Sequence, residues 1–214
     1  MPPDPADPSV QMVTGLMKRL GLDPRIQDYV TRSIRFHTHP APGVIIAVFM
    51  VDLAIELLGA RPGERLYAVC ETKKCAPDPL QVILGCTTGN KRLQVLPIGR
   101  FALTLNRATD GSAADGVRVF VDPKKLGAFP TIQAWYTHAR GFDKKEREAA
   151  LYEEILRAGR EILSHERVTL KVPGKEEWES TTCPCCGEMV PADLIEEGAC
   201  RGCGPMAYYE KKRA

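Results

Sequence analysis

Four cysteines near the C-terminus have the spacing of a metal site. Cys183 and Cys186 form one Cys-x2-Cys pair, Cys200 and Cys203 form a second, and a glycine follows each pair. Zinc in structural sites takes four ligands in a tetrahedron, and four thiolates leave no position open for catalysis. Glycine after the second cysteine permits the positive φ that turns backbone N–H groups towards the thiolates. We therefore predict a structural zinc ion bound by these four residues.

Disulfide bonds or a redox motif are the alternatives to a zinc site for these cysteines. Two disulfides would need an oxidising compartment, and a doubled Cys-x2-Cys pair is unusual for a thioredoxin-like redox motif. The first eight residues are polar, acidic and rich in proline, which is the opposite of a secretory signal. We therefore expect a reducing, cytoplasmic location and a zinc site, with Cys185 left as a free thiol.

Two histidines and a cysteine in the first half of the chain form a second group with chemical potential. His37 and His39 precede Pro40 and Pro42, and extended backbone there would place both side chains on one side, where they could bind one ion. Cys75 is predicted in a loop between a strand and a short helix, a usual place for a ligand or a reactive thiol. The alternative is that one histidine packs and the other faces water.

Hydrophobic periodicity predicts the elements that position these residues. The pattern indicates five helices: one that ends at Gly21, one that follows Pro24, and three over Gly43–Leu58, Asp78–Leu84 and Asp143–Leu163. Asp78 is expected to cap the fourth helix. The fifth is expected to begin with an Asp143/Glu146 capping box and to have His165 at its end. Strands are expected at 66–70, 93–96, 101–106, 117–121 and 168–172. The fold class is α+β, with a mixed or antiparallel sheet packed against helices and a small zinc-ribbon-like module at the C-terminus.

The composition divides the chain in two. We predict a core domain over residues 1–175 and a zinc-ribbon-like module over 176–214, separated at Pro173-Gly174. The first part holds 25 Lys and Arg against 19 Asp and Glu, whereas the second holds 4 against 8. Such charges disfavour a nucleic-acid binder. The longest apolar run, residues 43–58, contains Asp52 and Glu56 and is too short and charged for a membrane span.

Several short motifs, taken together, resemble a known family. They are Phe-His-x-His-x-x-Pro-Gly at 36–43, Cys75-x-x-Asp78-x-x-Gln81, Gly85-Cys86-Thr87, Gly99-Arg100-Phe101 and Gly116-Val117-Arg118-Val119, followed by the C-terminal cysteine pairs. In this combination and order they resemble the E-subunit family of formylmethanofuran dehydrogenase. The resemblance implies an α+β core domain, often followed by a zinc-ribbon-like module, in proteins associated with the molybdenum or tungsten enzyme that reduces CO₂ onto methanofuran.

The sequence departs from the family at the histidine motif. The family usually has His-Gly-His-x-Cys-Pro-Gly, whereas this chain has Thr38 in place of the glycine and Ala41 in place of the cysteine. A second metal site would therefore rest on His37, His39 and Cys75, with Asp78 or Cys86 nearby. The missing thiol removes one ligand or nucleophile.

Three functions follow from these patterns. The first is a metal-binding accessory protein with a structural zinc and a second metal or ligand site, since the chain lacks the cysteine run of iron–sulfur proteins and a dinucleotide fingerprint. The second is a small enzyme in which Cys75 is the nucleophile and His37 or His39 the base. The third, disfavoured by the acidic tail, is a zinc-ribbon nucleic-acid binder. We also expect a homodimer, because the helix over Gly43–Leu58 is apolar nearly all round, and a protein partner bound through the C-terminal module.

Overall fold

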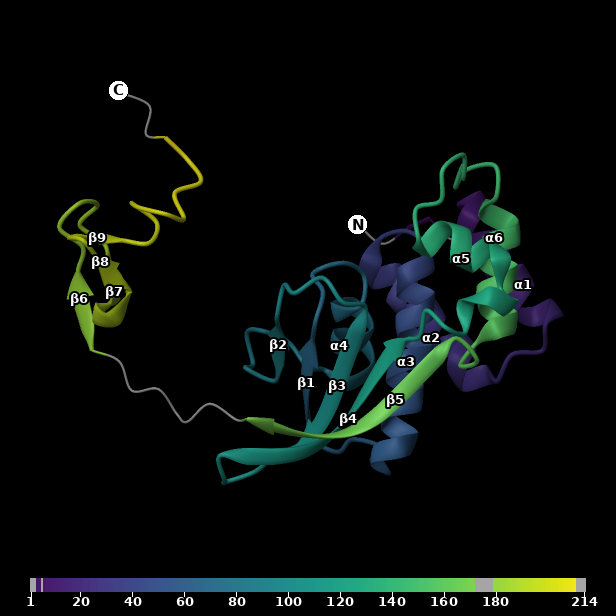
Figure 1. Cartoon of the computed structure of the whole chain (residues 1–214), viewed down its shortest axis with the longest axis horizontal. Helices are drawn as coiled ribbons and strands as arrows, with labels where there is room; N and C mark the ends of the chain where they lie inside the picture. Colours follow the sequence, from purple (N-terminus) through teal and green to yellow (C-terminus); the bar gives the residue numbers. More distant parts are fainter. Residues whose placement is uncertain (1–2, 5, 172–178, 211–214) are drawn as a thin grey trace. The chain divides into compact units, whose positions relative to one another are not determined.

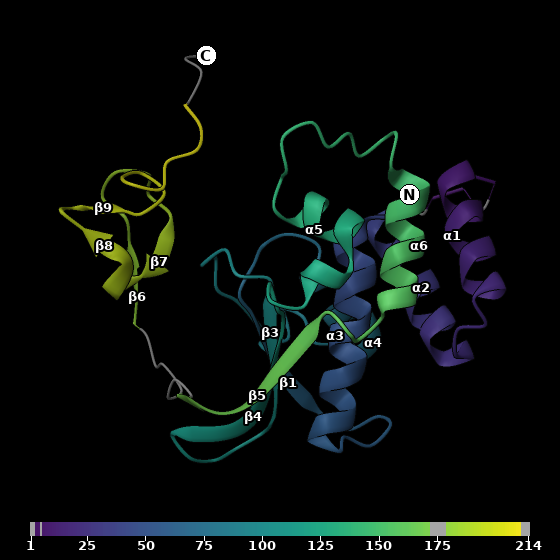
Figure 2. The ribbon, with the colours of Figure 1, turned by 45° about the vertical axis from the view of Figure 1, so that its right-hand side comes forward.

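The computed structural model describes residues 3–4, 6–171 and 179–210. The chain forms two compact units, Met1–Val172 and Pro173–Ala214. The first unit contains the longer helices and the main sheet, and the described part of the second, residues 179–210, contains short strands, turns and a 3-10 helix at Ala192–Leu194 (Figures 1 and 2).

The first unit is built around one mixed sheet. Its strand order is β2-β1-β3-β4-β5, and only the β1–β2 pair is parallel. The strands are β1 (Leu66–Cys70), β2 (Leu93–Val95), β3 (Ala102–Arg107), β4 (Ala113–Val121) and β5 (Leu163–Lys171). β3 and β4, which correspond to the strands expected at 101–106 and 117–121, pair as an antiparallel hairpin, and the α+β class is confirmed.

Five of the six helices described in this unit correspond to predicted ones, and the helix over Pro130–Tyr136 was not predicted. They are α1 (Pro8–Arg19), α2 (Pro24–His37), α3 (Pro42–Leu58), α4 (Pro77–Leu84), α5 (Pro130–Tyr136) and α6 (Glu148–Ala158). The carboxylates of Asp7 and Asp23 cap α1 and α2 by accepting backbone N–H groups, and proline occupies the first turn of each helix. None of the helices in the described ranges is long and apolar enough to cross a bilayer.

Helix α3 is the centre of the core (Figures 1 and 2). Every residue from Pro42 to Asp52 is buried, and the helix contacts β3, β4, α2, α4 and α6. The predicted helix over Gly43–Leu58 is thus confirmed, and Gly59 ends it with φ +63°. Elements of the same chain cover α3 on all sides. The apolar character of this helix is therefore no longer a reason to expect a homodimer.

One charged residue lies inside this apolar helix. The side chain of Asp52 is 2% exposed and contacts the guanidinium groups of Arg25, at 2.9 Å, and of Arg160. Arg160 also contacts Glu56 at 2.9 Å. These contacts tie α3 to the start of α2 and to the segment after α6. A buried carboxylate requires such partners, because desolvation of an unpaired charge costs several kcal/mol.

The last predicted helix is wrong at both ends. Helix α6 runs only from Glu148 to Ala158, and the Asp143 carboxylate accepts the N–H groups of Lys145 and Glu146 in a preceding turn instead of forming a capping box. The chain turns at Gly159, with φ +50°, and β5 begins at Leu163. His165 therefore lies on β5, opposite Val119, and does not interact with a helix end.

We predict that breaking the Asp52 ion pairs destabilises the first unit strongly. Arg160→Met should lower the free energy of unfolding by about 2–3 kcal/mol, because it leaves the buried carboxylate with Arg25 alone. The matched control is Arg157→Met, which removes an exposed pair with Glu153 and should cost less than about 1 kcal/mol. Urea denaturation followed by circular dichroism measures both, and equal losses would contradict the assigned role of Asp52.

Candidate metal centre

The C-terminal unit holds its cysteines at two tight turns. The first turn, Cys183 to Cys186, connects β6 (Ser180–Thr182) to β7 (Met189–Pro191), and the second follows β9 (Ala199–Cys200), which pairs with β8 (Ile195–Glu196). Gly187 has φ +77°, and its N–H donates to the carbonyl of Cys183 at 2.9 Å. The glycine after the first pair thus adopts the conformation that the sequence predicts.

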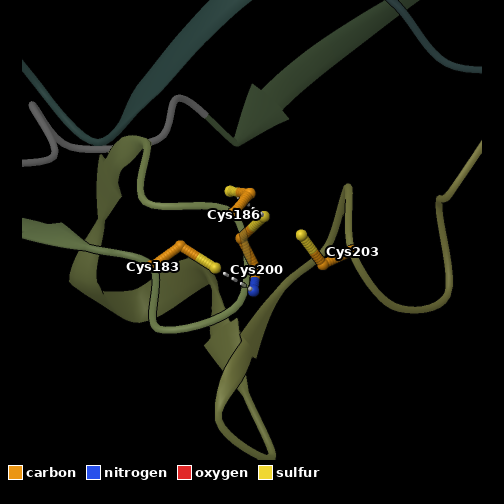
Figure 3. Close-up of side chains that lie close together, drawn as sticks. All are labelled: Cys183, Cys186, Cys200 and Cys203. Carbon is orange, nitrogen blue, oxygen red and sulfur yellow. Dashed lines mark hydrogen bonds between the residues drawn. The ribbon is translucent and has the colours of Figure 1, made fainter. Parts of the chain in front are cut away.

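These turns bring four sulfurs to one point (Figure 3). The Sγ atoms of Cys183, Cys186, Cys200 and Cys203 all lie within 4.8 Å of one another. The Sγ atoms of Cys186 and Cys200 are 3.9 Å apart, and the N–H of Cys200 donates to Sγ of Cys183 at 3.3 Å. An ion bound at about 2.3 Å from each sulfur fits between ligands at these separations. Cys185 is exposed and is not one of the four.

The electrostatics of the cluster favour a bound cation. Backbone N–H groups of Cys186 and Cys200 lower the pKa of Cys183 to about 6, so its thiolate forms readily. Hydrogen bonds with the neighbouring thiols of Cys185, Cys186 and Cys200 raise the pKa of Cys203, because they favour its protonated form. A divalent metal ion would replace the shared protons and stabilise all four thiolates together.

The histidine region lies where α2 and α4 meet near the start of α3. His37 is the last residue of α2, and its Nδ1 lies 2.6 Å from Oδ2 of Asp78 in the first turn of α4. Asp78 does not cap α4 as predicted; Ala76 is the cap position, and the Asp78 carboxylate contacts His37 instead. The rings of His37 and His39 are 4.7 Å apart between centroids. Partial burial lowers the pKa of His39, and the charges of His37 and Lys144 add to the effect.

The backbone between the two histidines differs from the expected extended segment. His37 is helical, and Thr38 caps α2 in the left-handed region with φ 72°. A β-branched residue is unfavourable there, because its side chain crowds the backbone at positive φ. Glycine would adopt this conformation without strain. This turn, and not an extended strand, brings the two rings together.

Cys75 lies against the first turn of α3. A Cβ atom added to Gly43 would lie 3.0 Å from both Cβ and Sγ of Cys75, so a larger residue there would have to displace the Cys75 side chain. Burial raises the pKa of the Cys75 thiol, and the negative charge of Asp78 raises it further. Because of this raised pKa, Cys75 is a neutral thiol at neutral pH. Nearby, the hydroxyl of Tyr152 donates to the carbonyl of Pro40 at 2.9 Å, a contact for which the sequence carries no signal.

The remaining candidates serve the core or lie on the surface. Cys86 is buried and its thiol donates to the carbonyl of Leu66, while burial raises the pKa of Cys70 to about 11. His138 is exposed. Among the residues that the structure describes, the four C-terminal cysteines are the group of three or more potential ligands close enough for one ion. A second metal site at His37, His39 and Cys75 stays a prediction.

Three comparisons relate the chain to known proteins. A curated relative from Archaeoglobus fulgidus, described as a probable S-adenosyl-L-methionine-binding protein, is 30% identical over an alignment of 195 residues. The match covers 83% of this chain, which spans about half (52%) of that relative's length. A crystal structure of a protein from Syntrophus aciditrophicus that is like the E-subunit (FmdE) of tungsten formylmethanofuran dehydrogenase is 38% identical, with a TM-score of 0.73, over 86% of this chain and 95% of that one. Residues 36–171 match the family model described as "FmdE, Molybdenum formylmethanofuran dehydrogenase operon". With more than half of its length matched to that model, the chain belongs to the FmdE family.

Proposed function

We propose that this protein is an accessory metalloprotein of the FmdE family whose C-terminal unit is folded around one structural zinc ion. The observation that carries the proposal is the cluster of four cysteine sulfurs within 4.8 Å of one another. Four thiolates complete a tetrahedron around zinc and leave no position for water or substrate. The ion would hold the chain in place and take no part in a reaction.

The burial pattern of the C-terminal unit supports this role for the metal. Within its described residues, 179–210, only Cys183 and Cys200 are buried. A unit of this size without an apolar core does not bury enough surface to fold, and natural small modules add a metal or disulfides instead. None of the eight cysteines is in a disulfide. The proposed cytoplasmic location has the same support, since reduced thiols persist in a reducing compartment.

We propose that the C-terminal unit also contacts a partner protein. Its described residues include the exposed large side chains of Met189, Met206, Tyr208 and Tyr209. Exposed methionine and tyrosine are typical of protein–protein interfaces. The acidic composition of the same unit disfavours a nucleic acid as the partner.

A second site is proposed in the first unit, at His37 and His39. A carboxylate that accepts a hydrogen bond from Nδ1 of a histidine is the usual second ligand shell of a metal-bound imidazole, and Asp78 is placed in this way. The neutral thiol of Cys75 would be a poor ligand and a poor nucleophile, because the thiolate is the reactive form. The raised pKa of the Cys75 thiol therefore supports a small-ligand or weak metal site over an enzyme that uses Cys75.

We propose a homodimer on the basis of exposed apolar side chains, since the buried helix α3 no longer supports one. Leu96 and Ile98 are exposed beside the edge strand β2 and would be covered by a second copy. Light scattering of the full chain at micromolar concentration should give a mass near 47 kDa, twice 23.6 kDa. A mass of one chain under these conditions would rule the dimer out.

We predict that the C-terminal unit unfolds without its metal. Purified protein should contain one equivalent of zinc, and Cys200→Ser should lose it, because removal of one thiolate opens the tetrahedron. The matched control is Cys185→Ser, an exposed cysteine outside the cluster, which should retain the full equivalent. Metal analysis together with amide hydrogen exchange over residues 179–210 gives the answer. A full equivalent of zinc with an ordered unit in Cys200→Ser would refute the four-cysteine site.

We predict that Cys75 reacts slowly with iodoacetamide at pH 8, because its raised pKa keeps the thiol protonated. Asp78→Asn should accelerate its alkylation several-fold, since removal of the negative charge lowers the thiol pKa. Asp28→Asn, which changes an exposed carboxylate on α2, should leave the rate unchanged. Mass spectrometry of the Cys75 peptide measures the rates across pH. Fast alkylation of the wild-type Cys75 below pH 7 would instead support the enzyme hypothesis.

A further inference from the structure

A groove between α1 and α2 lies apart from both sites described above. It has a volume of about 590 Å³, and its apolar lining includes Pro3, Val10 and Ile34. Volumes of this size are typical of pockets for small molecules. The two helices are joined by four residues, and the groove is lined by α1 and by the C-terminal part of α2.

A glycine keeps the floor of this groove open. Gly15 lies inside α1 and lines the groove, and an added Cβ atom would meet nothing within 4 Å. Glycine inside a helix costs about 1 kcal/mol relative to alanine. No close contact within the described chain explains that cost, because a larger side chain would fit without a clash. The space above Gly15 is thus available to a molecule that is not part of this chain.

Two cations flank the groove. Lys18 lies in the last turn of α1 and Arg35 in the last turn of α2, and both residues line the groove. Neither has a carboxylate partner in the parts of the chain that the structure describes, whereas Arg19 and Arg32 on the same helices pair with Glu153 and Asp28. Val10 and Lys18 are eight residues apart, or about 12 Å along the helix. The groove therefore combines an elongated apolar floor with unneutralised positive charge.

We propose that this groove binds a linear acyl carboxylate of medium chain length. The hydrocarbon chain would lie over Gly15 and contact Val10 and Ile34, and the carboxylate would pair with Lys18 or Arg35. A second copy docked groove to groove by a two-fold axis would place cations against cations, which disfavours self-association here. An acyl carboxylate has both an apolar chain for the apolar lining and a negative charge for the cations.

Decanoate, kept below its micelle concentration, is the probe for this site in the full-length protein. Methyl resonances of Val10 and Ile34 should shift saturably, and affinity should fall about two- to fourfold for each methylene removed from the chain. Gly15→Leu should weaken binding by about tenfold or more while the protein stays folded, because leucine fills the groove and favours the helix. Gly15→Ala should have a smaller effect.

Charge variants test the role of the two cations. Lys18→Met/Arg35→Met should weaken decanoate binding about three- to tenfold and leave decanol binding unchanged. The control Arg19→Met/Arg32→Met removes two cations from the same helices and should have no effect on either ligand. Unchanged decanoate affinity in Gly15→Leu, or the absence of a saturable shift in the wild type, would overturn the proposal. It would also fail if the same methyl groups shifted with protein concentration alone, since a second copy would then occupy the groove.

Discussion

The structure of the first unit depends on covering one helix. Helix α3 is buried on all sides from Pro42 to Asp52, so the sheet must lie on one side of it and α2, α4 and α6 on the others. Its burial stabilises the fold through the hydrophobic effect, at roughly 25 cal/mol for each Å² of apolar surface removed from water. The same packing brings the end of α2, with His37, to the first turn of α4, with Asp78. The contact between His37 and Asp78 is thus a consequence of how α3 is covered.

The second unit has no comparable core. Among its described residues the buried side chains are two of the four clustered cysteines, so the interior is the ligand set itself. The first unit therefore folds by apolar burial, with the buried carboxylates of Asp52 and Glu71 paired to arginines. We propose that the second folds around a cation instead. A metal site needs particular residues at particular intervals along the chain. For this reason the cysteine spacing alone predicts which four residues cluster.

The sequence predicts those features that periodicity or ligand spacing determines. The helix over Gly43–Leu58, the β3–β4 hairpin and the four-cysteine cluster are of this kind. The helix predicted to end at Leu163 was wrong because Ile162 and Leu163 stay buried after Gly159 and continue the apolar pattern in a strand. Contacts between distant segments carry no local signal, and the approach of Cys75 to Gly43 could not be predicted for that reason.

On our proposal, a metal ion bound by four cysteines replaces a hydrophobic core in the C-terminal unit. X-ray absorption spectroscopy at the zinc edge tests this most directly, because it reports the type and distance of the atoms bound to the ion. We predict one zinc ion with four sulfur neighbours at about 2.3 Å and no nitrogen or oxygen ligand. A coordination shell that contains nitrogen or oxygen, or protein that purifies folded without metal, would contradict the proposal.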